Sequence, residues 1–222
     1  MAELPREPGR DAGREPAGAG LVVRPEPYDS PVARRLAAAL EAELDERYAG
    51  DPDPCGTPEL MAVWGVRPEQ VVPPAGTFLV AWLDREPVGC GAVRPMITGE
   101  PGVAEVKRMY TAPSARRRGV SRAVLTALED AARRLGYRRL QLETGVRQPE
   151  AIALYESAGW HRIPAYGQYA ADPLSVCFAK DLDAGPAHEP GSRHASADQG
   201  APADQSASSG PGGPVRAYHS QP

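Results

Sequence analysis

A run of basic residues stands directly before a helical segment, and this is where the sequence offers chemistry. Arg116, Arg117 and Arg118 precede Gly119, and Arg122 follows within one turn. The first turn of a helix leaves backbone N–H groups without partners, and the helix dipole favours an anion there. Gly119 would let the backbone approach an anion closely, and the arginines could add charge-assisted hydrogen bonds. The pattern favours a binding site for a phosphate or diphosphate group.

Two other interpretations of the basic run stay open. It could be a solvated helix start, or it could be a basic patch that binds RNA. The formal net charge of −4 and the lack of aromatic residues within the run argue against a nucleic-acid partner. The spacing fits neither the G-x-x-x-x-G-K-[ST] loop of nucleotide hydrolases nor the G-x-G-x-x-G turn of dinucleotide-binding folds.

Two segments in a fixed order carry a more specific pattern. They are Arg116-x-x-Gly119-x-Ser121 and Ala151-x-x-Leu154-Tyr155-x-x-x-Gly159-Trp160. With one predicted strand between them, they resemble the Q/R-x-x-G-x-G/A loop and the A-x-x-L-Y-x-x-x-G-F/Y segment of the GNAT superfamily of N-acetyltransferases. Ser121 departs from the usual Gly or Ala but is small. Gln148-Pro149 stands where many members carry Asn.

The resemblance implies a cofactor, a reaction and a set of binding residues. Acetyl-CoA would be the co-substrate, and its acetyl group would pass to a primary amine of a small molecule or amino acid by direct attack in a ternary complex. In the family, a bulge frees backbone N–H groups of one strand for the pantetheine and thioester. The implied cofactor-binding residues are Met109, Tyr110, Thr111, Arg116, Arg117, Arg118, Gly119, Val120, Ser121 and Arg122.

Three residues are candidates for proton transfer in that reaction. An alkyl amine is mostly protonated at neutral pH, so a general base is needed, and Glu105 is the first candidate and Glu143 the second. The alternative for both carboxylates is an ion pair with Arg or Lys. Tyr155 is the candidate general acid for the departing thiolate, although a core tyrosine would show the same helical spacing. Tyr166, Tyr169 and Ser175 could read an amine or carboxylate, or simply pack.

Period-two alternation assigns the side chains of the strand predicted at 105–111 to two faces. The first face would carry Glu105, Lys107 and Met109, and the second Val106, Arg108 and Tyr110.

The hydrophobic pattern predicts an α+β domain. Leucines and valines at helical spacing and short apolar runs between turn residues indicate a mixed, mostly antiparallel central sheet flanked by helices. The predicted helices cover 31–48, 120–135 and 150–158, and the predicted strands cover 21–24, 77–83, 88–95, 105–111, 139–144 and 174–180.

Composition sets the domain boundaries and the expected setting. Gly and Pro, with 23 and 25 copies, gather at both ends, so residues 1–20 and 184–222 are predicted to be disordered tails around a domain at 21–183. The three cysteines are widely spaced, which indicates neither a disulfide framework nor a zinc pair. The sequence has no apolar run of about 20 residues, so we expect a cytoplasmic enzyme with no membrane contact. It could form a homodimer.

Two alternatives to a small-molecule enzyme stay open. The acceptor could be a protein or peptide, or the domain could be a regulatory module that binds CoA without turnover.

Overall fold

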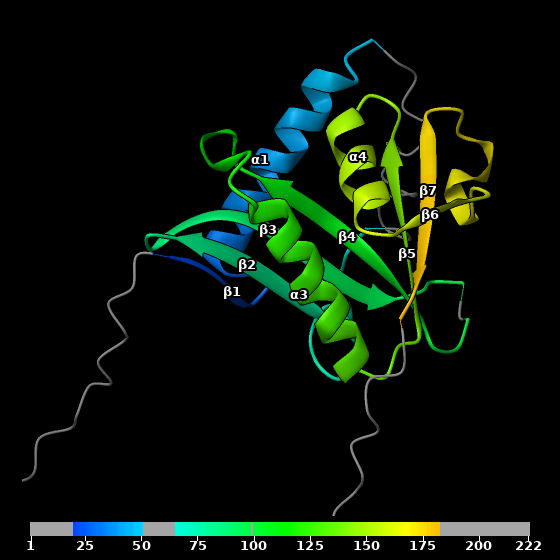
Figure 1. Ribbon diagram of the computed structural model, residues 1–222, viewed down its shortest axis with the longest axis horizontal. Helices are drawn as coiled ribbons and strands as arrows, with labels where there is room; N and C mark the ends of the chain where they lie inside the picture. The colour runs from blue at the N-terminus through cyan, green and yellow to red at the C-terminus, as the bar shows by residue number, and fades with distance from the viewer. Residues whose placement is uncertain (1–19, 51–64, 99, 183–222) are drawn as a thin grey trace, which may run out of the picture. The chain divides into compact units, whose positions relative to one another are not determined.

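A computed structural model describes residues 20–50, 65–98 and 100–182 of the 222-residue chain. In this part of the chain, seven strands form one sheet in the order β1-β2-β3-β4-β5-β7-β6 (Figure 1). The strands are β1 (Leu21–Pro25), β2 (Thr77–Leu83), β3 (Glu86–Pro95), β4 (Val103–Thr111), β5 (Arg139–Gly145), β6 (His161–Ile163) and β7 (Ser175–Asp181). Every neighbouring pair is antiparallel except β4 and β5, which run parallel. The predicted mixed, mostly antiparallel sheet is confirmed.

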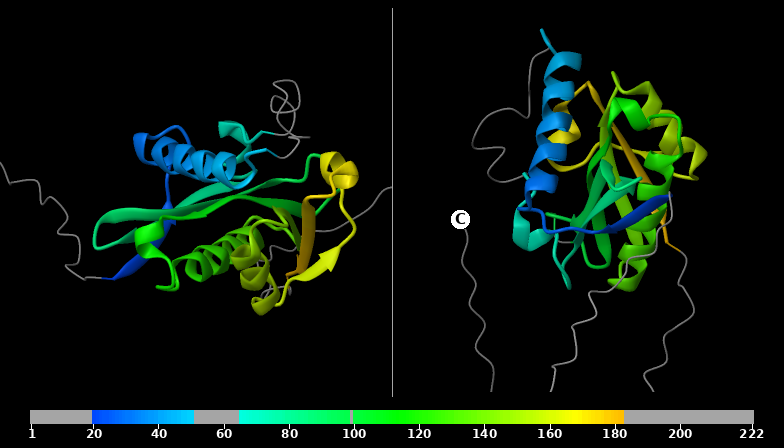
Figure 2. Two further views of the ribbon diagram at one scale, coloured as in Figure 1. Left: turned by 90° about the horizontal axis from the view of Figure 1, so that it is seen from above. Right: turned by 90° about the vertical axis from the view of Figure 1, so that its left-hand side faces the viewer.

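Helices cover both faces of this sheet (Figure 2). One face carries α1 (Pro31–Arg47), and the other carries α3 (Val120–Arg134) and α4 (Pro149–Ser157). The described residues contain no helix with the length and apolar character needed to cross a bilayer. The tails predicted at 1–20 and 184–222 lie outside the described residues, apart from residue 20.

Each face has its own apolar core, built by alternate residues of the strands. Against α3 and α4 pack Leu79, Ala81, Val93, Val106, Leu140, Leu142 and Phe178 of the sheet. Against α1 pack Phe78, Val80, Cys90 and Ala92. The sheet is therefore buried on both faces near its centre, and the two cores meet only through it.

Capping fixes where the two long helices begin and end. Ser30 caps α1, because its hydroxyl accepts the Ala33 N–H at 3.1 Å and Pro31 follows it. Gly136 ends α3 at φ +87°. The Tyr137 and Gly136 N–H groups donate to the carbonyls of Ala132 and Arg133, which is a Schellman cap. Both ends agree with the sequence pattern.

The parallel pair β4–β5 is short, and this feature positions the site. Its register covers only Val103–Glu105 against Arg139–Gln141, although β4 runs on to Thr111 and β5 to Gly145. Beyond Glu105 the two strands part, as Figure 1 shows. The diverging ends leave backbone groups of β4 without a strand partner on that side.

A bulge in β4 accompanies this divergence. The β3–β4 register shifts between Cys90↔Tyr110 and Ala92↔Lys107, so β4 has one extra residue there. Arg108 takes a positive φ of +58° at this point. The family resemblance implied a bulge in this strand, and the register shift agrees with it.

The bulge makes the predicted face assignment of β4 wrong from Arg108 onward. Glu105 and Lys107 do share a face, but Met109 packs with Val106 on the α3 face. Tyr110 instead packs into the α1 core, and Arg108 pairs with Glu41 of α1 at 2.8 Å. Arg108 and Tyr110 therefore lie on the α1 side of the sheet, and Met109 lies on the other side. Strict alternation fails because one extra residue reverses the side chains that follow it.

Candidate functional site

The loop before α3 has the geometry of an anion site. Gly119 is the N-cap residue with φ +79°, a conformation that favours glycine. It has no side chain to cap α3, so the first-turn amides of Val120, Ser121 and Arg122 lack an intrahelical partner. The Val120 side chain is buried in the core under α3, which leaves its amide as the group that could meet a ligand.

The three arginines of this loop and Arg122 in the first turn of α3 differ in their contacts. Arg117 and Arg118 are exposed and form no side-chain hydrogen bond or ion pair with a described residue, so they remain candidates for contacts to phosphate. Arg116 turns toward α1: its Nε donates to the Thr111 carbonyl at 3.1 Å and its Nη2 pairs with Glu43. Arg122 turns the other way and donates to Ser157 Oγ at 2.6 Å, so it joins α3 to the end of α4.

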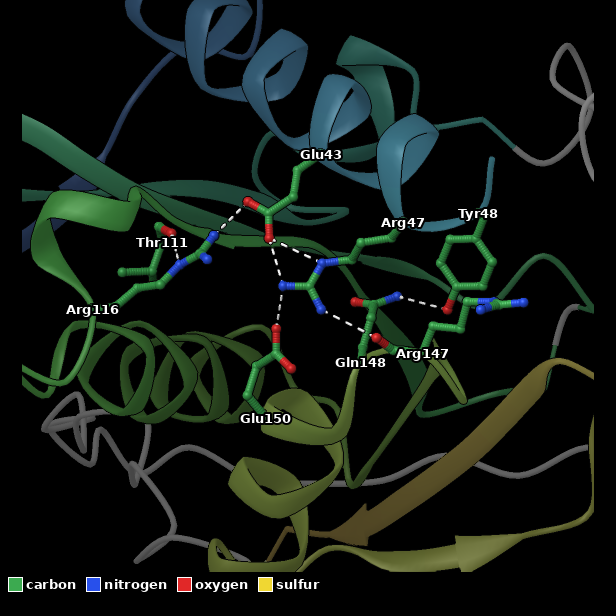
Figure 3. Close-up of polar contacts among 8 residues, drawn as sticks. All are labelled: Glu43, Arg47, Tyr48, Thr111, Arg116, Arg147, Gln148 and Glu150. Carbon is green, nitrogen blue, oxygen red and sulfur yellow. Dashed lines mark hydrogen bonds and ion pairs between the residues drawn. The ribbon is translucent and has the colours of Figure 1, made fainter. Parts of the chain in front are cut away.

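A second ionic cluster lies beside this loop and joins α1 to α4 (Figure 3). Arg47 of α1 donates to Glu43 Oε1 at 2.7 Å, pairs with Glu150 in the first turn of α4, and donates to the Arg147 carbonyl at 3.1 Å. Glu43 thus lies between Arg47 and Arg116. The cluster connects α1 on one face of the sheet with α4 and with the loop before α3 on the other face.

Tyr48, which follows α1, closes the same region by direct contact with the sheet. A Cβ placed on Gly145, the last residue of β5, would lie 1.6 Å from Tyr48 Oη. In this arrangement the Tyr48 phenol occupies the space that a side chain at residue 145 would take. The Gln148 amide lies 3.5 Å from the same hydroxyl.

The diverging end of β4 offers backbone groups at the junction between the two faces. On its β3 side, Tyr110 pairs with Cys90 and Thr111 with Gly89, whereas β5 no longer pairs with it. The Thr111 hydroxyl is buried, faces Gly89 of β3, and makes no hydrogen bond with a described residue. The end of β4 can therefore contact a ligand through its main-chain groups.

Glu105 sits where β4 and β5 part, and it is held in a buried ion pair. Its Oε2 accepts Nε and Nη2 of Arg94 at 2.9 and 2.6 Å, and its Oε1 accepts the Tyr166 hydroxyl at 3.1 Å. The side chains of Arg94 and Glu105 are 0% and 3% exposed. Arg94 also donates to the Gly65 carbonyl at 2.8 Å. Both oxygens of Glu105 are thus already used.

Glu143 lies on β5 and faces the same side of the sheet. Its Oε1 lies 2.9 Å from Ser175 Oγ, whose one proton Glu143 shares with Asp172 Oδ2 at 2.8 Å, and its side chain is only partly exposed. Burial raises the pKa of Glu143 above its ordinary value, and the charge of Lys107 and the Ser175 hydrogen bond oppose that rise. A carboxylate with a raised pKa accepts a proton more readily than an ordinary one.

Lys107 and two tyrosines complete this polar cluster. The Lys107 ammonium donates to Tyr169 Oη at 2.5 Å and lies 3.9 Å from Glu105 Oε1. Burial lowers the pKa of Lys107, but Glu105, Tyr169 and Glu143 outweigh it, so the net pKa is raised and the lysine stays charged. Tyr166 and Tyr169 meet edge to face at 5.4 Å between ring centroids.

Tyr155 lies on α4 with its ring in the core between Trp160 and Phe178, at centroid distances of 5.9 and 5.7 Å. Burial, and then the charge of Glu143, raise the pKa of its hydroxyl well above the ordinary value. The phenol therefore keeps its proton at neutral pH. The ring of Tyr155 is thus part of the core, and its role as a proton donor stays a prediction. The charge of Glu143 relates its hydroxyl to the polar cluster.

Several members of the site were not singled out from the sequence. Arg94 could have been, because an arginine inside the apolar strand V-G-C-G-A-V-R-P requires an anionic partner once buried. Glu43 and Arg47 form an i, i+4 pair that a helix pattern displays. Their partners Arg116, in the loop before α3, and Glu150, on α4, could not be inferred, because these contacts are set by how the elements pack. Cys177 is buried, and burial raises its pKa to about 11, as suits an apolar packing residue.

No group of three or more histidine, cysteine or acidic side chains with metal-binding geometry occurs among residues 20–50, 65–98 and 100–182.

Sequence comparison relates the chain to acetyltransferases. Residues 36–160 match the Acetyltransferase (GNAT) family. An IAA acetyltransferase of Azospirillum brasilense is 39% identical over 154 residues, which cover 69% of this chain and 95% of that protein. YsnE, an uncharacterized N-acetyltransferase of Bacillus subtilis, is 38% identical over 116 residues, covering 51% of this chain and 75% of YsnE.

Structural comparison agrees. A Klebsiella pneumoniae protein assigned to the acyl-CoA N-acyltransferases has a TM-score of 0.59 at 30% identity, over 74% of this chain and 99% of that one. The PaiA N-acetyltransferase of Thermoplasma acidophilum, solved in complex with coenzyme A, has a TM-score of 0.52 at 14% identity, over 73% and 99%. The latter likeness concerns the fold.

The fold and the relatives together define an acyltransferase. The chain belongs to the GNAT family of acetyltransferases.

The buried pair of Arg94 and Glu105 generates a prediction about stability. Arg94→Met should lower the free energy of unfolding by about 3–5 kcal/mol, because it leaves the Glu105 carboxylate buried without its partner. Arg94→Met combined with Glu105→Gln should recover most of that loss, since no uncompensated charge remains. Urea denaturation of the three proteins measures both effects.

An exposed pair supplies the control. Arg67 and Glu69 have side chains 49% and 68% exposed, so Arg67→Met should cost less than about 1 kcal/mol. A loss in Arg94→Met no larger than in Arg67→Met would contradict the assigned role of the buried pair.

Proposed function

We propose that this GNAT protein transfers the acetyl group of acetyl-CoA to a primary amine of a small molecule or an amino acid, by direct attack within a ternary complex. The observation that carries the proposal is the separation of β4 from β5 beyond Glu105 and Gln141. At this separation, the polar cluster on the α1 face and the anion-binding loop at the start of α3 both lie beside the diverging strand ends. Two substrates held on opposite sides of the sheet could meet at this point.

Several features fit acetyl-CoA. The first-turn amides of α3 at Val120, Ser121 and Arg122 suit the diphosphate, and the charges of Arg117 and Arg118 would assist. Main-chain N–H groups of the segment Met109–Thr111 would bind the pantetheine and polarise the thioester carbonyl. Glu43 and Arg47 border the same loop. The CoA complex of a GNAT structural neighbour is consistent with such a site.

The polar cluster on the α1 face suits the acceptor. Glu143, Lys107 and Ser175 are partly exposed there and surround a position next to the strand separation. The amine must lose a proton to attack the thioester carbonyl, and the bond from the carbonyl carbon to sulfur then breaks to release CoA. A half-buried cluster of a few polar side chains suits a small amine.

Of the two candidate bases, we assign the role to Glu143. Glu105 is 2% exposed, and its oxygens already accept three hydrogen bonds, two from Arg94 and one from Tyr166. Glu143 is more exposed and has a raised pKa, so it can take the amine proton directly or through water. Glu105 is instead a positioning residue that holds Tyr166 beside the acceptor.

Tyr155 is the proposed hydrogen-bond donor to the departing thiolate. Its raised pKa keeps the hydroxyl protonated throughout the neutral range. A thiol has an ordinary pKa near 8.5, so the phenol stabilises the developing charge on sulfur mainly by hydrogen bonding.

The experiment that tests the proposal measures binding first and turnover second. Calorimetry should show association of the purified chain with acetyl-CoA, and CoA release should be followed against a panel of amines, amino acids and peptides. We expect turnover with at least one small amine or amino acid. Turnover with peptides alone would move the proposal to a protein acceptor, and binding without turnover on any of them would favour a CoA-binding module. Folded protein that does not bind acetyl-CoA would refute the proposal.

A pH profile tests Glu143 as the base. The base must be ionised, so kcat/KM should fall as the pH drops through its raised pKa, at a pH above that of an ordinary carboxylate. Glu143→Gln should lower kcat by about 10²- to 10⁴-fold and remove this acid limb.

Ser175→Ala is the matched variant that tests the same acid limb of the kcat/KM profile. The Ser175 hydroxyl stabilises the ionised form of Glu143 and so lowers its pKa. Removing that hydroxyl should move the acid limb to higher pH while activity at alkaline pH is kept. An unshifted limb in Ser175→Ala, together with near-normal kcat in Glu143→Gln, would exclude Glu143 as the base.

Tyr155→Phe tests the hydrogen bond to the thiolate. The ring contacts with Trp160 and Phe178 survive this change, so the melting temperature should stay close to that of the wild type. We expect kcat to fall by about tenfold or more, because one hydrogen bond to a charged group is worth roughly 1.5–3 kcal/mol. Steady-state kinetics at saturating acetyl-CoA provides the measurement, and a wild-type kcat would remove Tyr155 from the mechanism.

A further inference from the structure

Glu43 of α1 is shared between two arginines at the edge of the loop that precedes α3. Its Oε1 accepts Nη2 of Arg47 at 2.7 Å, and its Oε2 pairs with Nη2 of Arg116 (Figure 3). Glu43 and Arg116 are 24% and 38% exposed in their side chains, so water screens their attraction only in part. The carboxylate belongs to the helix on the acceptor face, whereas Arg116 belongs to the loop on the other face.

The Arg116 guanidinium is held in place by this pair. Its Nε donates to the Thr111 carbonyl at the end of β4, and its Nη2 is held by Glu43. Arg117 and Arg118, in contrast, extend without a partner among the described residues. Of the three consecutive arginines, Arg116 alone has its positive charge offset by an acidic side chain of the described chain.

A diphosphate bound at the start of α3 would carry negative charge toward the same guanidinium. Glu43 then opposes binding in two ways: it neutralises Arg116, and its own charge repels the phosphates. Arg47 stays attached to α4 through Glu150 and to the Arg147 carbonyl, so α1 keeps these ties when the contact between Glu43 and Arg116 opens.

We propose that Glu43 is a counter-ion that competes with the diphosphate of CoA for Arg116, and that α1 thereby sets the affinity of the cofactor site. This inference rests on the proposed function, since it assumes that the diphosphate binds beside Arg116. The diphosphate is common to acetyl-CoA and CoA, so Glu43 weakens the binding of substrate and product alike. Uniform weakening of this kind leaves the chemical step unchanged and speeds the release of CoA.

The test is calorimetric titration of the full chain with acetyl-CoA and with CoA. Glu43→Gln should lower the Kd for both ligands by about two- to fivefold, which is the range for a partly exposed ion pair. Glu43→Ala should change the Kd in the same direction. Glu46→Gln is the matched control and should leave both Kd values unchanged. It removes the same charge three residues along α1, from an exposed side chain that forms no hydrogen bond or ion pair with a described residue.

A double mutant identifies the partner through which Glu43 acts. In an Arg116→Ala background, Glu43→Gln should no longer tighten binding, because the contested guanidinium is gone. Unchanged or weaker binding in Glu43→Gln, or tightening that persists without Arg116, would overturn the inference. Wild-type protein that binds neither ligand would instead refute the proposed function, so the two failures are distinguishable.

Discussion

The buried pair of Arg94 and Glu105 lies at the point on which the rest of the site depends. Glu105 is the last residue of β4 that pairs with β5, and Arg94 faces it across the β3–β4 ladder. The pair joins β3 to β4, and the Arg94 bond to the Gly65 carbonyl extends it to the chain that follows α1. Ion pairs buried this deeply add little net stability, but breaking one is costly, so they specify arrangement. In this protein, the pair specifies the point at which β4 and β5 begin to separate.

From that point outward, the bulge at Arg108 exchanges the faces of the following residues. Met109 goes to the α3 core and Tyr110 to the α1 core, so the main chain of β4 lies at the junction with apolar side chains on each side. The starts of α3 and α4 lie at the same end of the sheet. The bulge and the strand separation together leave main-chain groups of β4 without a strand partner and place apolar side chains on both sides of them.

Much of this could be predicted from the sequence, and the misses have physical causes. The elements were predictable because apolar periodicity, Ser30 and Gly136 are local signals. The bulge followed only from family resemblance, because no residue type marks it. The face of Met109 was therefore predicted wrongly. The pairing of Glu105 with Arg94 and of Arg116 with Glu43 depends on how separate elements pack, which no local pattern reports.

Tyr48 brings the end of α1 into direct contact with the main chain of β5 at Gly145. Apolar side chains at an interface can change rotamer and absorb small shifts, whereas here a phenol lies directly against main chain that has no side chain to yield. A methyl group added at residue 145 would take the place of the Tyr48 hydroxyl, so the phenol would have to leave its position against β5 and the end of α1 would lose this contact with the sheet.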